Sequence, residues 1–102
     1  MIEITREDGK ALIRPTEEDV VSAWVPEYRS KMRGALAEGA REVVLDLTNV
    51  QMVDSTGIGL LIAAHNSLRK LGGHLAVIHA SEEIRNLFQS MRIHQHFSVS
   101  GE

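Results

Sequence analysis

A short apolar strand with a helix close behind it constrains the fold of this chain most strongly. Residues Val43 to Leu47 are almost all apolar, which is typical of a central strand covered on both faces of a sheet. A helical pattern of apolar residues then runs from about Thr56 to Leu71 and ends at Gly72. Strands that alternate with helices predict a layered α/β architecture, with parallel strands joined by right-handed crossovers.

The rest of the chain continues this alternation, and the predicted order is β-β-α-β-α-β-α-β. The sequence contains no linker, repeat or low-complexity segment, so residues 1–102 are predicted to form one domain. The predicted elements are strands at Ile2–Ile4, Ala11–Ile13, Val43–Leu47, Leu75–Ile78 and Phe97–Val99, helices from between Ser22 and Val25 to near Gly39, from Thr56 to Leu71 and from Ser81 to Met91, and a loop from Arg14 to Asp19.

Composition excludes several classes of function. The chain has 14 acidic and 11 basic residues and a net charge of -3, whereas a dedicated nucleic-acid-binding surface needs concentrated positive charge. Cysteine is absent, which excludes disulfides and thiolate metal sites. The longest uncharged apolar run, Ile58 to Ala64, is far too short to span a bilayer, and the N-terminus carries no signal-peptide pattern. We therefore expect a cytoplasmic domain that neither inserts into a membrane nor binds nucleic acid directly.

The start of the central helix is the strongest candidate for a functional site. The run Asp54-Ser55-Thr56-Gly57 places a hydroxyl in the first turn, where backbone N–H groups have no partner within the helix and the helix dipole is positive. Such a position holds a phosphate well, whether the phosphate is bound or covalently attached. Asp54 is expected to cap the helix, to orient the Ser55 hydroxyl, or both. Asp46, within the apolar strand, is expected to cap or brace the turn that follows.

Two apolar stripes run along this helix. The first is expected to face the sheet and consists of Leu60, Leu61, Ala64, Leu68 and Leu71. The second contains Ile58 and Ile62 with His65 and Arg69, and Ser55 projects toward the same side. We expect Ile58 to be substantially exposed, so that the second stripe forms a protein-binding patch beside the hydroxyl. The alternative is that Ile58 and Ile62 pack against a neighbouring helix, as most apolar helix residues do.

The motifs of catalytic and metal sites are incomplete in this chain. Ser55 lacks the glycine two residues before it that a nucleophile elbow needs. The run Gly57-Ile58-Gly59 lacks the third glycine of a dinucleotide-binding loop, because Ile62 stands there. His94 and His96 have no carboxylate or cysteine at ligand spacing and are interpreted as exposed residues near the C-terminus. The sequence therefore predicts no enzyme, no metal site and no cofactor.

Three segments together resemble the STAS domain, and more specifically the bacterial anti-sigma factor antagonists. The segments are Val43-Val44-Leu45-Asp46-Leu47, Val53-Asp54-Ser55-Thr56-Gly57-Ile58-Gly59-Leu60-Leu61 and Leu71-Gly72-Gly73. The helix from Ser81 to Met91 also fits, and the resemblance covers essentially the whole chain. An Asp-Ser-Ser/Thr-Gly-apolar motif between a strand and a helix is quite specific for this family. The resemblance implies a mixed β-sheet flanked by α-helices, which agrees with the predicted order.

The resemblance also implies a function. In this family a partner anti-sigma factor, which is also an ATP-dependent kinase, phosphorylates the serine two residues before the glycine, and that position is Ser55 here. The unphosphorylated antagonist binds the kinase and releases the sigma factor, the phosphorylated form dissociates, and a phosphatase resets it. Ser55 rather than Thr56 is thus expected to accept phosphate. The expected partner-binding residues are Asp19, Asp54, Ser55, Thr56, Gly57, Ile58 and Ile62.

One segment departs from the family pattern. Many members carry a Gly-x-Leu/Ile-Asp turn between the second strand and the first helix, but the segment from Pro15 to Ser22 contains no glycine. Asp19 is expected to take the acidic role near Ser55. A second hypothesis is a non-switching scaffold subunit of a larger signalling or transport assembly, in which Ser55 only caps the helix. A third, a hydrolase that uses Ser55, lacks the base and the oxyanion pattern.

Overall fold

The structure is a computed structural model that describes residues 2–20 and 23–102. Its elements are β1 (Ile2–Glu7), β2 (Lys10–Pro15), β3 (Asp19–Val20), α1 (Val25–Ala37), β4 (Glu42–Asp46), β5 (Met52–Val53), α2 (Ser55–Lys70), β6 (His74–Ile78), α3 (Glu82–Ser90), the 3-10 helix η1 (Ile93–Gln95) and β7 (Ser98–Val99).

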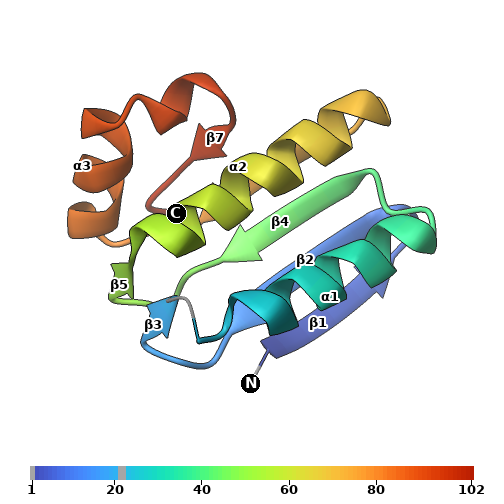
Figure 1. Cartoon of the computed structure of the whole chain (residues 1–102), viewed down its shortest axis with the longest axis horizontal. Helices are drawn as coiled ribbons and strands as arrows, with labels where there is room; N and C mark the ends of the chain where they lie inside the picture. The colour runs from blue at the N-terminus through green and yellow to red at the C-terminus, as the bar shows by residue number, and fades with distance from the viewer. Residues whose placement is uncertain (1, 21–22) are drawn as a thin grey trace.

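The main sheet has five strands in the order β1-β2-β4-β6-β7, and a separate two-stranded sheet pairs β3 with β5. β1 and β2 form an antiparallel hairpin, whereas the other pairings are parallel. α1 and α2 lie side by side on one face of the main sheet, and α3 and η1 lie near β7 (Figure 1). The α/β fold class is therefore confirmed, with a mixed sheet flanked by helices.

Alternate residues of the three inner strands build the core. Two rows of side chains cross β2, β4 and β6, and each of these side chains is at most 2% exposed because the pleat points them all to one face. The rows are Ala11, Val43 and Leu75, followed by Ile13, Leu45 and Val77. β4, predicted to be the central strand, is the middle strand of the sheet.

Several helix ends lie where the sequence predicted them. The Ser81 hydroxyl accepts a hydrogen bond from the Ile84 N–H at 3.2 Å and caps α3. Gly39 and Gly72 follow α1 and α2 with φ angles of 101° and 78°, in the left-handed region that glycine adopts without steric cost. The Asp46 carboxylate accepts a hydrogen bond from the Thr48 N–H at 2.9 Å, so it braces the turn after β4 as predicted.

Two short strands are missing from the predicted order. β3 and β5 have two residues each, which is too short to produce a recognisable apolar alternation. The predicted loop from Arg14 to Asp19 is also too long, because Arg14 and Pro15 complete β2 and Asp19 begins β3. α1 begins at Val25, within the predicted range; Val21 and Ser22, which belong to the predicted segments, lie outside the described residues.

Candidate phosphorylation and partner-binding site

Asp54 caps the N-terminus of α2. Its Oδ1 accepts a hydrogen bond from the Gly57 N–H at 2.8 Å, and its backbone carbonyl accepts one from the Ile58 N–H at 3.0 Å. The predicted capping role of Asp54 is confirmed. Ser55 is the first residue within the helix, so the cap is formed without its hydroxyl.

The Ser55 and Thr56 side chains are exposed on the first turn of α2. The Ser55 hydroxyl makes no hydrogen bond to any residue that the structure describes. The N–H groups of Ser55 and Thr56 have no carbonyl partner within the helix, because the residues four positions before them lie outside the helix. A phosphate attached to Ser55 would therefore lie near free N–H donors and the positive end of the helix dipole.

The small sheet of β3 and β5 supports this turn from one side. The Asp54 N–H donates to the Val20 carbonyl at 3.1 Å. A Cβ atom added at Gly57 would lie only 2.7 Å from the same carbonyl oxygen, so the helix and β3 approach closely because residue 57 is glycine. Asp19 is exposed and pairs in register with Met52, on the strand that leads into α2.

Tyr28 of α1 contacts the segment that leads into β3, an interaction that the sequence analysis missed. Its hydroxyl donates to Oε2 of Glu17 at 3.4 Å, and the next carbonyl, that of Glu18, accepts from the Met52 N–H at 3.2 Å. Burial, assisted by the negative charge of Glu27, raises the pKa of Tyr28 from 10.0 to about 12, so the hydroxyl stays protonated to a higher pH than that of an exposed tyrosine. The sequence contains no signal for this contact, because the apolar pattern of α1 predicts that Tyr28 is buried but does not indicate a partner for its hydroxyl.

The prediction that Ile58 is exposed is wrong. Ile58 is 5% exposed and belongs to the hydrophobic core, so it is not part of a surface patch. At about 100° per residue, the buried side of α2 extends from Leu60 round to Ile58, an arc of roughly 160°. The sequence analysis assumed a narrower arc centred nearer Leu60. It also placed Leu71 in the core, but this residue follows the end of α2 and is 47% exposed.

The C-terminal segment covers the second stripe of α2. The His65 ring lies 5.9 Å from the His96 ring and 5.7 Å from the Phe97 ring, measured between centroids. Ile62, on the same side, is half-buried and packs against the core. The alternative prediction, that Ile58 and Ile62 pack against a neighbouring helix, is right that they form no open patch, since Ile58 is buried and Ile62 packs against the core.

The exposed apolar surface next to Ser55 is formed by different residues. Met52 is 49% exposed and Leu87 is 36% exposed, and both line a shallow hollow between β5 and α3. Met52 lies only three residues before Ser55. The sequence did not reveal this surface, because β5 was not recognised. The helical spacing of Ile84, Leu87, Phe88 and Met91 also suggests one apolar face, whereas only Ile84 and Phe88 are buried.

Comparison with known proteins identifies the family. A sequence profile described as the STAS domain matches residues 2–101 of the chain. The chain belongs to the STAS domain family. The resemblance drawn from the sequence motifs is thereby confirmed.

Relatives of this STAS domain include anti-sigma factor antagonists. The "Anti-sigma-B factor antagonist" of Staphylococcus aureus (strain NCTC 8325 / PS 47) is 31% identical over 65 residues, which are 64% of this chain and 60% of that protein. The chain thus spans less than two thirds of the length of the curated relatives that it matches first.

Solved structures have the same fold. An anti-sigma factor antagonist from Mycobacterium paratuberculosis superposes with a TM-score of 0.86 at 17% identity, covering 100% of this chain and 86% of the other. The Bacillus cell fate determinant SpoIIAA in its phosphorylated form gives a TM-score of 0.76 at 19% identity, covering 97% and 90%. At these identities the likeness establishes the fold.

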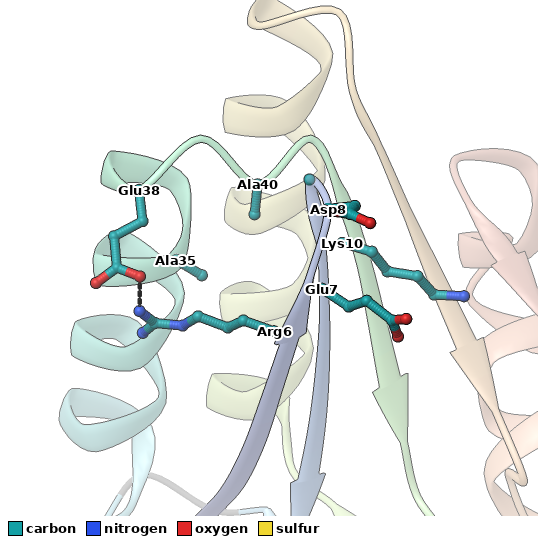
Figure 2. Close-up of a pocket in the computed structure, with 8 residues that line it drawn as sticks. Arg6, Glu7, Asp8, Lys10, Ala35, Glu38 and Ala40 are labelled. Carbon is teal, nitrogen blue, oxygen red and sulfur yellow. Dashed lines mark hydrogen bonds and ion pairs between the residues drawn. The ribbon is translucent and has the colours of Figure 1, made fainter.

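A second hollow of this STAS domain lies at the opposite end of the sheet, at the β1–β2 turn. Figure 2 shows Arg6 of β1 paired with Glu38 beyond α1, with Glu7, Asp8 and Lys10 around the turn. Charges of both signs are mixed here, so the hollow does not concentrate positive charge for a phosphate. This end of the sheet is remote from Ser55, because β4 starts beside the turn and leads away from it toward β5.

Residues 2–20 and 23–102 present neither a candidate metal-ion site nor a membrane-spanning helix. No group of three or more His, Cys, Asp or Glu side chains in these ranges could hold a metal ion. None of the helices there combines the length and the apolar character needed to cross a membrane.

Proposed function

We propose that this STAS domain is an anti-sigma factor antagonist that is switched by phosphorylation of Ser55. The unphosphorylated form binds an anti-sigma factor with serine kinase activity and releases the sigma factor. The phosphorylated form dissociates, and a phosphoserine phosphatase restores the active form. The names of the Staphylococcus relatives support the regulatory role, and the matching position of Ser55 in the family motif supports the site.

One observation carries this proposal: the Ser55 hydroxyl, in the family's phosphorylation motif, is exposed, and Asp54 rather than Ser55 caps the helix. A phosphoserine adds about -1.5 to -2 charges near pH 7. At the first residue of a helix this charge is favourable, so the domain keeps its fold. Phosphorylation would then act on the complex with the partner and not on the stability of the domain.

The proposed binding surface has Ser55 at its edge. Met52 and Leu87 supply exposed apolar area, and Asp19, Thr56 and the half-buried Ile62 complete the surroundings. A partner that covers Met52 and Leu87 would have to desolvate a neighbouring phosphate, which is costly for a charged group without an opposite charge. This cost explains why the modified form would dissociate.

In this proposed function the protein has no catalytic activity of its own and acts in the cytoplasm, where sigma factors and their regulators meet. The sequence contains no Gly-Lys-Ser/Thr phosphate-binding loop of its own, so the phosphate must come from the partner kinase. No nucleic acid contact is needed, because the sigma factor is controlled through the anti-sigma factor.

Incubation with candidate anti-sigma factor kinases and labelled ATP tests this function. We expect label on Ser55, none in Ser55→Ala, and normal labelling in Thr56→Ala. Titration of the kinase should then show tight binding of the unmodified protein and weak binding of the phosphorylated one. If the kinase binds but neither hydroxyl is labelled, the domain is the non-switching scaffold and the switch is wrong.

A further inference from the structure

A groove between α1 and α2 has no role in the proposed switch. Its volume is about 290 Å³, and its floor is apolar. Met32 of α1 and Leu60 of α2 are buried at the bottom, and Leu36 and Ala64 are half-buried beside them. Ser55 does not line this groove.

The two rims of the groove differ in charge and size. Arg29 and Arg33 stand on the α1 rim, four residues apart, so they project from the same side of the helix. Both arginines are exposed, and neither has a hydrogen bond or ion pair to a described residue. Ala63 and Ser67 on the α2 rim are small and exposed. The groove therefore combines an apolar floor with one unpaired positive rim, on a chain whose net charge is -3.

The dimensions of the groove fit a helix better than a small molecule. Ligand pockets usually enclose about 300–1,000 Å³, and the volume of this open groove, about 290 Å³, falls just below that range. The lining residues run from Arg29 to Leu36 on α1 and from Leu60 to Ser67 on α2, and each span is about 10 Å, or two helical turns. The small side chains of Ala63 and Ser67 leave room for another backbone to approach on that side.

We propose that this groove binds an amphipathic, acidic helix of a partner protein. The apolar face of that helix lies on Met32, Leu36 and Leu60, and its Asp or Glu side chains pair with Arg29 and Arg33. Helix-in-groove recognition uses anchors spaced by one turn in this way, and complementary charge fixes the orientation. The proposal does not depend on modification of Ser55.

Two labelled helical peptides of about 14 residues, long enough to span the groove with about one turn to spare at each end, provide the probes. Both carry the same leucine face, and one carries two glutamates on its flank where the other carries two lysines. We expect the glutamate peptide to bind at least about 10-fold more tightly, with NMR shift changes confined to the residues that line the groove. Arg33→Glu should weaken it about fivefold or more, because attraction at the rim becomes repulsion.

Lys31→Glu is the matched control, since it makes the same charge reversal at an exposed α1 position that does not line the groove. This control should leave the affinity for both peptides nearly unchanged. Equal affinity for the two peptides, shift changes elsewhere, or no saturable binding below about 1 mM would overturn the proposal. So would sedimentation as a dimer that Arg33→Glu dissociates, because a second copy would then be the occupant.

Discussion

Asp54 and Ser55 are neighbours with separate tasks, since Asp54 caps α2 and Ser55 is exposed beside the cap. We predict that Ser55→Asp keeps the helix content and stability of the parent, because a negative charge is favourable in the first turn. Asp54→Ala should lose about 0.5–2 kcal/mol through the missing cap. Urea melts followed by circular dichroism measure both effects. A loss of stability in Ser55→Asp as large as that in Asp54→Ala would contradict the separation of tasks.

Gly57 and Gly59 form a second matched pair of residues on α2. A Cβ at Gly57 meets the Val20 carbonyl oxygen at 2.7 Å, whereas a Cβ at Gly59 meets nothing within 4 Å. We predict that Gly59→Ala stabilises the domain by about 0.5–1 kcal/mol, as expected for glycine replaced within a helix. Gly57→Ala should instead destabilise it, because the clash pushes β3 away from the helix. Thermal melts of the two variants test both expectations. Equal shifts of Tm would refute the close packing of Gly57 against Val20.

Secondary-structure elements with strong periodicity were predictable from the sequence. The order of the longer strands and helices, the caps at Gly39, Gly72 and Ser81, and the position of Ser55 at a helix start all follow from local patterns. β3 and β5 were not predictable, since two-residue strands exist only through their pairing partner. The burial of Ile58 was also hidden, because it depends on how neighbouring elements pack around α2 and not on the pattern of α2 itself.

The packing of α2 and α3 reverses the sequence-based expectation that Ile58 is an exposed partner-binding residue. Ile58→Ala should cost about 2–5 kcal/mol, because it opens a cavity in the core. Leu87→Ala should cost much less, since Leu87 is 36% exposed, but should weaken partner binding by at least about 1 kcal/mol. Denaturant melts and kinase titrations on both variants test this. Intact kinase binding by Leu87→Ala would remove α3 from the proposed surface.

The stability of the chain as a whole should depend on alkaline pH through Tyr28. The folded protein holds the pKa of Tyr28 at about 12, above the ordinary value of 10.0. Between these values the unfolded chain releases the proton while the folded chain keeps it, so stability is complete below pH 10 and falls as pH rises toward 12. The full loss is roughly 2–3 kcal/mol.

Tyr28→Phe is the variant that isolates this effect from the titration of lysines. It should cost about 1 kcal/mol near pH 7 by removing the hydrogen bond to Glu17, yet lose less stability than the parent between pH 10 and 12. Urea melts at several pH values measure how the free energy of unfolding of the parent and of the variant changes with pH. Parallel curves for parent and variant would show that Tyr28 titrates normally in the folded protein.

The helix cap at Asp54 has a practical consequence for observing this protein. Because position 55 is not needed for the cap, it can carry a chemical label without loss of the helix. The sequence contains no cysteine, so Ser55→Cys would introduce a unique thiol. A solvatochromic dye attached there would sit at the edge of the proposed contact surface. Its emission would then follow arrival and departure of a partner in real time, in a single-label experiment.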